Sequence, residues 1–525
     1  MTQERIATAC VASPHRLATE AGVEMLRRGG NALDAAVAVN LVLAVVAPSS
    51  CGLGGDLFLL LWKDGELVAY NGSGRAPAAA TPDAVRRAAE EAVGARDLGG
   101  LPERGALSVT VPGAVEAWFR ILRRFGTRTF AECAASAIRC ATEGFVPSAQ
   151  GGITVREAAA SFPRGDPAFA EWHAVYDPVR EGRPFRQPGI GRTLAALGSD
   201  GPDTFYRGAI AAAIVDAVRS HGGLLAAEDL ADHEGEWIRP LSTAYRGLEV
   251  VELPPNTQGI VALEALAMLD DAGPLPPEGD ARQHLLLEVT KLGLSDRRYV
   301  TDPDHMRVTP SELLDGARLR GMASTVDPER AGAPPSAYAA PGGTAHMAVV
   351  DGKGMCVSLI QSNWEGFGSG LTVPGWGINL HNRGSRFFLD EDRANVIAPR
   401  KRPMHTLIPG MALRGGRPRY VFGTMGGDGQ AQIHIQLLAR LVDDGWEPRR
   451  AVDAPRWVLD LVDWSVAAES RFDAAVIEGL RRRGHHVEVT MPFDASMGHA
   501  NVIEIRGDGL AAAADPRSEG AAIAF

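Results

Sequence analysis

A threonine that opens a strand directly after two glycines constrains this chain more than any other feature. Residues 331–343 are rich in alanine, proline and glycine, and they end at Thr344. Apolar residues then run from Met347 to Val350, an Asp-Gly turn follows, and residues 355–361 read as the returning strand. We therefore predict a β-hairpin whose first strand starts at Thr344.

A threonine in this position can become a nucleophile if the backbone is cut in front of it. Scission between Gly343 and Thr344 would free an α-amine beside the hydroxyl. An amine with a pKa of about 8 can deprotonate that hydroxyl at neutral pH, so that no histidine or aspartate is needed. On the residues alone, Gly-Gly-Thr is more often a plain turn.

Stretches spread over nearly the whole chain, in the same order, resemble the γ-glutamyltranspeptidase family of N-terminal-nucleophile hydrolases. The resemblance is carried by residues 29–36, 52–56, 111–115, 344–351, 366–370, 401–403, 426–427 and 515–517. Other nucleophile, zinc and nucleotide-binding motifs do not occur in the sequence. We expect neither a cofactor nor a metal.

The fold class predicted from the residues is α/β with antiparallel hairpins. The resemblance implies more, namely a four-layer αββα sandwich in which two antiparallel sheets lie between helical layers. It also implies one precursor cut into a large subunit, residues 1–343, and a small catalytic subunit, residues 344–525. A dimer of these two-subunit units would be compatible with it.

The secondary structure expected from apolar periodicity and turn residues fits such layering. The predicted helices are 17–28, 31–46, 114–124, 282–300, 430–441 and 475–482, with a surface helix and loop over 81–103. The predicted strands outside the Thr344 hairpin are 6–12, 57–62, 67–70, 248–253, 406–413, 419–424, 487–490 and 501–505.

The resemblance assigns catalytic roles to four residues. Thr344 is the nucleophile, and Ser362 stands where the family has a hydroxyl that binds the free amine. Gly426 and Gly427 match the oxyanion-hole pair, because amides at the start of a helix can approach a developing negative charge. Without the resemblance, Ser362 is a strand-end serine and the two glycines are a strand-to-helix turn.

The residues that would bind the substrate depart from the family pattern. Arg75 lies two positions after the usual arginine, and His405-Thr406 replaces a pair of serines. Arg386 stands where the family has an acid that binds the substrate amine. We therefore expect Arg386, helped by Arg383, to bind a carboxylate, since an arginine facing an ammonium would be unfavourable.

A second interpretation of this arginine needs no substrate. Arg386 could point outward and pair with Asp390 or Asp392 on the loop that follows. Surface ion pairs of this kind are common and contribute little to stability.

Composition limits the partners of the chain. Its 525 residues carry a formal charge of −11 with 45% hydrophobic and 22% charged residues, which is typical of a globular protein and argues against nucleic acid. The five cysteines are scattered without zinc spacing, and the first residues lack a signal peptide's apolar core. We expect no membrane association and predict a cytoplasmic location.

The predicted function is a self-processing amidohydrolase or acyltransferase that cleaves a γ-glutamyl-type or related small carboxylated amide. The acyl group would pass from Thr344 to water or to an amine acceptor. One alternative is an oxamate-type amidohydrolase, and an alternative from another class is a processed but inactive binding protein. The presence of Thr344 together with Gly426 and Gly427 argues against the inactive protein.

Overall fold

Two large antiparallel sheets form the centre of the molecule. The computed structural model describes residues 7–93, 99–333 and 343–525. The first sheet has the strand order β18 (Ala521–Ala524), β1 (Cys10–Ser13), β7 (Gly343–Val350), β8 (Cys356–Trp364), β2 (Asp56–Lys63), β3 (Glu66–Gly72) and β4 (Glu236–Ile238). The second has the order β17 (Gly509–Ala514), β16 (His499–Arg506), β12 (Arg417–Met425), β11 (Gly410–Arg414), β6 (Leu248–Glu252) and β5 (Leu241–Tyr245).

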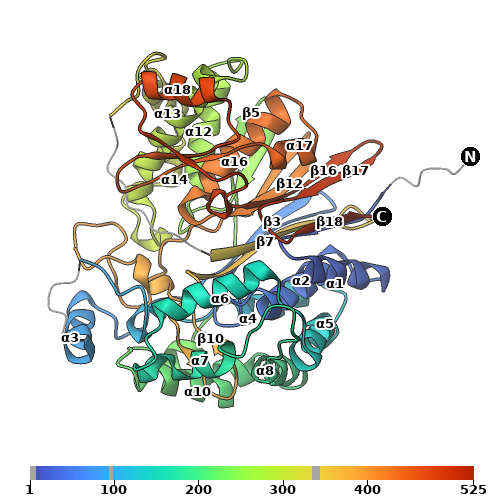
Figure 1. Cartoon of the computed structure of the whole chain (residues 1–525), viewed down its shortest axis with the longest axis vertical. Coiled ribbons are helices and arrows are strands. Elements are labelled where there is room, and N and C mark those ends of the chain that lie inside the picture. Colours follow the sequence, from blue (N-terminus) through green and yellow to red (C-terminus); the bar gives the residue numbers. More distant parts are fainter. Residues whose placement is uncertain (1–6, 94–98, 334–342) are drawn as a thin grey trace, which may run out of the picture.

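Helices cover the outer face of each sheet, as Figure 1 shows. Beside the first sheet lie α1 (Arg16–Arg27), α2 (Ala32–Val46), α4 (Ala114–Phe125), α5 (Phe130–Glu143), α6 (Ala149–Ser161), α7 (Ala170–Tyr176), α8 (Pro188–Asp200), α9 (Asp203–Tyr206) and α10 (Ala209–Arg219). Beside the second lie α12 (Gly259–Asp271), α13 (Asp280–Asp296), α14 (Pro310–Leu313), α15 (Gly316–Ala323), α16 (Gln430–Leu438), α17 (Pro448–Asp453) and α18 (Ala474–Arg482). The remaining elements are α3 (Pro82–Val93), α11 (Ala227–Ala231) and the small sheets β9 (Thr372–Val373) with β10 (Ile378–Asn379) and β13 (Trp457–Leu459), β14 (Val466–Glu469) and β15 (Val487–Thr490).

Three apolar clusters correspond to the three spaces between these four layers. One joins the first helical layer to the first sheet, and another joins the second helical layer to the second sheet. The third lies between the sheets, where Phe58 and Ile360 of the first sheet meet Val421 and Ile503 of the second. The predicted α/β sandwich with two antiparallel sheets is confirmed.

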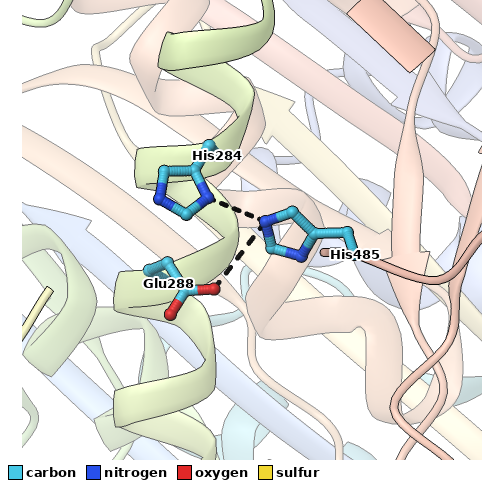
Figure 2. A group of neighbouring side chains, drawn as sticks. All are labelled: His284, Glu288 and His485. Carbon is cyan, nitrogen blue, oxygen red and sulfur yellow. Dashed lines mark hydrogen bonds and ion pairs between the residues drawn. The ribbon is translucent and has the colours of Figure 1, made fainter. Parts of the chain in front are cut away.

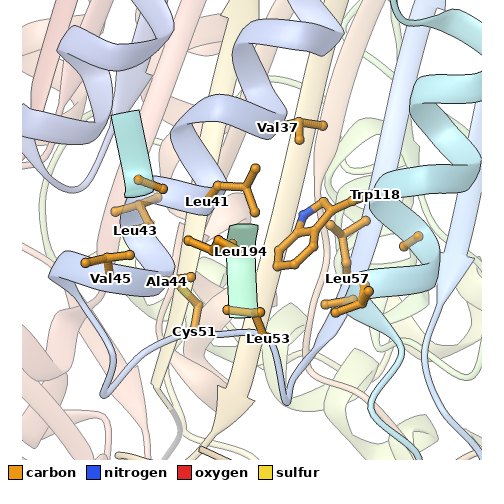
Figure 3. Packing of buried hydrophobic residues seen from close by; sticks show 14 of the residues in the cluster. Val37, Leu41, Leu43, Ala44, Val45, Cys51, Leu53, Leu57, Trp118 and Leu194 are labelled. Carbon is orange, nitrogen blue, oxygen red and sulfur yellow. The ribbon is translucent and has the colours of Figure 1, made fainter. Parts of the chain in front are cut away.

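Helix α2 shows how the sequence produces the first of these layers. Asn31 caps the helix in a capping box with Asp34, and every residue of the helix is buried. Its apolar side chains pack beside Leu57 of β2 and Trp118 of α4 (Figure 3). The buried Asn40 accepts a hydrogen bond from the Trp118 indole at 2.7 Å, so its polar amide does not disrupt the core.

Strand β7 places alternate side chains in different layers. Ala345, Met347 and Val349 belong to the cluster under the helices, whereas Ala348 and Val350 belong to the cluster between the sheets. Period-two alternation therefore directs the even-numbered positions of β7 toward the second sheet. The nucleophile predicted at position 344 stands on this inner side of the strand.

The predicted hairpin from Thr344 is confirmed, and two predicted strands are partly wrong. The strand predicted over 6–12 begins only at Cys10. The second sheet contains Gly410–Arg414 rather than all of 406–413. His405 instead bonds to Asn256 and Gln258 through its backbone, which keeps the chain before Gly410 outside the sheet ladder. The predicted helix 282–300 ends at Asp296, and residue 6 of the first predicted strand and most of the tract 331–343 lie outside the described residues.

Within the three described ranges, no helix combines the length and the apolar character that crossing a membrane requires.

Candidate active site

Thr344 lies at the start of β7 with its hydroxyl buried and unused. The residue is 2% exposed, and its Oγ1 atom has no hydrogen-bond partner within the described part of the chain. The β7–β8 ladder shifts register between Gly343 and Ala345, so β8 carries an extra residue opposite Thr344. Bulges of this kind are frequent beside active sites, because they redirect a side chain out of the regular ladder.

Ser362 of β8 contacts the bond that self-processing would cut. Its hydroxyl donates to the Gly343 carbonyl oxygen at 2.5 Å. Oγ of Ser362 in turn accepts from the backbone N–H of Trp364 at 2.7 Å and from Nη2 of Arg383 at 3.3 Å. Because two donors occupy the hydroxyl oxygen, its only proton points to the carbonyl, which it polarises for attack.

Trp364 organises the arginines next to this serine. The residue is fully buried and has a φ of +76°, which is unusual for a bulky side chain and often marks a functional position. The Arg383 guanidinium lies 4.3 Å from the centroid of the Trp364 ring, and the Arg386 guanidinium lies 5.0 Å from it. Cation–π contact therefore holds both predicted substrate-binding arginines at one ring.

Burial lowers the pKa of both guanidinium groups, to about 9 for Arg383 and about 10 for Arg386. Arg386 points inward and lies 3.8 Å from Asp428, not against Asp390, which pairs with Arg393. The outward interpretation of Arg386 is therefore not the arrangement in the structure.

Gly426 and Gly427 form the turn between β12 and the 3₁₀ turn Gly427–Gly429 that leads into α16. Their φ angles of +150° and +51° favour glycine. In the parts of the chain that are described, neither amide has an acceptor. The side-chain amide of Gln258 donates to the carbonyls of Gly427 and Thr406 at 3.1 and 3.2 Å, which fixes the turn beside the predicted pocket residues.

His405 and Thr406 are fully buried, and the structure adds two residues beside them. Oδ2 of Asp56 lies 3.2 Å from Nε2 of His405 and 3.4 Å from Nδ1 of His381. Burial, reinforced by the positive charge of Arg383, lowers the pKa of His405 to about 3, so this ring is neutral. Burial acts to raise the pKa of the Asp56 carboxyl, but the contacts with His381 and His405 and the hydrogen bond from the Gly74 amide outweigh it and lower this pKa to about 2.

Unpartnered buried polar atoms concentrate in this region. They include Oγ1 of Thr344 and Thr406, Nδ1 of His405, Nε1 of Trp364, Nε of Arg386, and Nε and Nη1 of Arg383. Native interiors leave few such groups unsatisfied, so each requires an explanation. Most of these atoms are hydrogen-bond donors, and an anionic, oxygen-rich ligand would satisfy them together.

A cavity of about 240 Å³ opens on the outer side of this group. Its wall includes Arg386 together with Arg297, Arg307 and Arg393 and the single carboxylate of Asp392. The excess of guanidinium groups favours an anionic occupant.

Two further predicted residues have other partners. Arg75 forms ion pairs with the carboxylates of Glu236 and Asp302 at 2.9 and 3.2 Å. Its positive charge is therefore already neutralised by the protein. His346 bonds to Ser358 at 2.9 Å, and burial lowers the pKa of His346 to about 3, which suits the predicted packed histidine.

The sequence did not identify Asp56 as a site residue. It was visible only as the acid that ends a glycine-rich turn at residues 52–56. Asp56 pairs with Ser362 across β2 and β8. This pairing depends on the tertiary fold, and it brings the carboxylate to its buried position between two imidazoles.

One group among the described residues has the composition of a metal site, namely His284, Glu288 and His485 (Figure 2). Nδ1 of His284 lies 2.8 Å from Nε2 of His485, and the ammonium of Lys291 lies 2.8 Å from the Glu288 carboxylate. The Lys291 charge already neutralises Glu288, so a divalent cation would leave a buried net charge of about +2, which is unfavourable. The group does not fit a metal.

Comparisons with known proteins agree with this geometry. The family model described as Gamma-glutamyltranspeptidase matches residues 18–525. The chain is 37% identical to a glutathione hydrolase-like YwrD proenzyme of Bacillus subtilis and 36% identical to an oxamate amidohydrolase proenzyme of Klebsiella pneumoniae, in each case over 98% of both chains. The crystal structure of a cephalosporin acylase from Bacillus halodurans covers 100% of the chain, and the chain covers 98% of it, with 35% identity and a TM-score of 0.92.

These matches confirm the predicted resemblance and the prediction of a self-processing enzyme of the N-terminal-nucleophile type, an amidohydrolase or acyltransferase. The chain belongs to the gamma-glutamyltranspeptidase family.

Proposed function

We propose that Thr344 cleaves the chain in front of itself and then hydrolyses small amides whose acyl group carries a carboxylate. The observation that supports this most is the contact between Ser362 and the Gly343 carbonyl, beside an unpartnered Thr344 hydroxyl. The amide that self-processing would cut is thereby held and polarised next to its nucleophile.

The first reaction is an N→O acyl shift. Oγ1 of Thr344 attacks the Gly343 carbonyl carbon, the C–N bond breaks as the hydroxyl proton passes to the leaving nitrogen, and water hydrolyses the resulting ester. The products are a large subunit that ends at Gly343 and a small subunit that begins with the free α-amine of Thr344. Residues 1–343 and 344–525 are our proposed subunits.

The second reaction uses the freed amine as a general base. It takes the proton of the Thr344 hydroxyl as Oγ1 attacks the substrate amide, and the unused amides of Gly426 and Gly427 stabilise the oxyanion. The amine then returns the proton to the leaving nitrogen. Water releases the acyl group, and an amine acceptor in its place would give transfer.

The donor-rich pocket supports an acidic acyl group. Arg383 and Arg386 would bind its carboxylate, and His405 and Thr406 would donate to its remaining oxygens. An oxamate-type amidohydrolase is the second candidate, supported by the nearness of Arg383 to Ser362 and by the oxamate amidohydrolase among the relatives.

We also propose a cytoplasmic location. The five cysteines are all free thiols in the structure, which suits a reducing compartment.

Intact-mass spectrometry of the purified protein tests self-processing. The parent should give two fragments, the smaller starting at Thr344, and Thr344→Ala should remain one chain. Ser362→Ala should process more slowly, since the Gly343 carbonyl loses its donor. Cleavage of Thr344→Ala at the same bond would assign the cut to another protease and remove the proposal.

A further inference from the structure

The Arg383 guanidinium is a buried charge without an ion pair. Its side chain is completely buried, and no carboxylate of the described residues lies within 4.0 Å of it. Two of its nitrogens, Nε and Nη1, have no hydrogen-bond partner in the described ranges. Burying an unpaired charge costs several kcal/mol, so a folded protein retains one where a ligand completes it.

The acidic groups around Arg383 are engaged elsewhere. Arg297 binds the Asp428 carboxylate. Arg104 lies 3.5 Å from Glu365, whose pKa rises to about 7 because the residue is buried. The Asp56 carboxylate accepts from the amides of Gly74 and Gly113 and faces two imidazoles.

Arg383 lies close to the reacting bond. Its Nη2 atom is 3.3 Å from Oγ of Ser362, and that same Oγ is 2.5 Å from the Gly343 carbonyl oxygen. One hydroxyl therefore separates the guanidinium from the carbonyl that Thr344 would attack. A carboxylate bound to Arg383 can be only a short chain of atoms away from the acyl carbon.

Arg386 has different surroundings. Its guanidinium lies 5.0 Å from the Trp364 ring centroid, and Arg386 lines the cavity of about 240 Å³, which Arg383 does not line. Arg383 thus contacts the serine that bonds to the Gly343 carbonyl, whereas Arg386 lines the cavity, and each would suit an acyl chain of a different length.

We propose that Arg383 is the carboxylate anchor of the substrate and that its position beside Ser362 selects short acyl groups. The substrate class is amides whose carboxylate is bonded to the scissile carbonyl or separated from it by one carbon. A γ-glutamyl group, with three carbons between the two, would have to reach toward Arg386. This inference rests on the proposed amide hydrolysis at Thr344.

A ladder of amides tests the proposal on the unaltered, processed enzyme. Ammonia release is measured for oxamate, malonamate, succinamate and glutaramate, with propionamide as the neutral reference. We expect kcat/KM to be highest for the first two and to fall at least tenfold toward glutaramate.

Two matched variants identify the anchor. Arg383→Gln should lower kcat/KM for oxamate about 10²-fold relative to propionamide, and Arg386→Gln should lower that ratio less, by under about tenfold. The ratio removes any general effect of losing the bond to Ser362, and Arg383→Lys should restore part of the preference. Titration calorimetry with oxalate measures binding affinity without turnover. The Arg383 variants should lose oxalate binding, most completely in Arg383→Gln.

Other results overturn the proposal. Highest activity on glutaramate, or an unchanged ratio of oxamate to propionamide in Arg383→Gln, would move the anchor to Arg386 or outside this pair. Self-processing together with hydrolysis of glutaramate would in that case leave the proposed function intact. A parent that neither processes nor hydrolyses any amide would refute the function itself.

Discussion

Two buried polar groups in this molecule look alike in composition and differ in how their atoms are used. In the group of His284, Glu288, His485 and Lys291, which we call the His284 cluster, the polar side chains bond to one another or to backbone. In the nucleophile site, defined as Thr344, Ser362, Trp364, Arg383, His405 and Thr406, most polar side chains keep at least one unpartnered atom.

This difference separates a structural role from a binding role. A satisfied group stabilises the fold and has no capacity left for a ligand. An unsatisfied group is costly in the empty protein, and substrate binding would recover that cost. Changes in the His284 cluster should therefore affect stability without affecting catalysis, and changes in the nucleophile site should do the reverse.

The largest effect on stability should come from Glu288→Ala. It leaves the buried Lys291 ammonium without its carboxylate and the Gly332 amide without its acceptor. We expect a loss of about 3–5 kcal/mol in the free energy of unfolding, measured by urea denaturation. Glu20→Ala, which removes only an exposed pair with Arg16, is the control and should cost less than about 1 kcal/mol.

The activity of any folded Glu288→Ala protein sharpens the comparison. Its kcat should stay within a few-fold of the parent. A hundredfold lower kcat at unchanged stability would mean that Glu288 takes part in catalysis. The His284 cluster would then not be a purely structural group.

Gly427→Ala should have the opposite profile. A Cβ at a φ of +51° strains the turn and displaces the amide that would bind the oxyanion. We expect kcat to fall about 10²- to 10³-fold, with a loss of stability of about 1 kcal/mol. Steady-state kinetics beside a melting curve separates the two effects, and an unchanged kcat would exclude this turn from the mechanism.

Acid should destabilise the protein through its buried histidines. Burial lowers the pKa of His405 and of His485 to about 3 in the folded state, while an unfolded histidine titrates near 6.5. The unfolded state therefore binds more protons, and stability present above pH 6.5 is lost as the pH falls toward 3. The slope is at most about 1.4 kcal/mol per pH unit for each group.

Replacing either histidine by asparagine should make this slope shallower. Free energies of unfolding at pH 7, 6, 5 and 4 give the slope. A parent whose stability is flat over this range would mean that these rings are not held neutral.

The sequence predicted the α/β class and the hairpin at Thr344, and its resemblance to a known family predicted the layers. The hairpin at Thr344 was visible from a glycine pair, an apolar run and an Asp-Gly turn, which are local signals. The strand over 406–413 was overpredicted, because bonds from His405 to Asn256 and Gln258 override the local apolar pattern. Asn256 and Gln258 are distant from His405 in the sequence, so no local pattern indicates these bonds.

The pocket was less predictable than the fold. Arg383 and Arg386 were both expected to bind a carboxylate, but nothing in the sequence shows which of them contacts Ser362. That contact depends on the tertiary arrangement in which both guanidinium groups lie at the Trp364 ring and Arg383 bonds to Ser362. Asp56 was missed for the same reason, since its two histidines follow it by more than three hundred residues.

The most direct test of the mechanism is to locate the acyl group during turnover. The processed enzyme is mixed with oxamate or another accepted amide, quenched in acid within milliseconds, digested and analysed by mass spectrometry. We predict that the peptide beginning at Thr344 gains the mass of the acyl group, and that Thr344→Ala gives no adduct on any peptide. An acyl group on a different residue, or an equal adduct in the Thr344→Ala protein, would contradict Thr344 as the nucleophile.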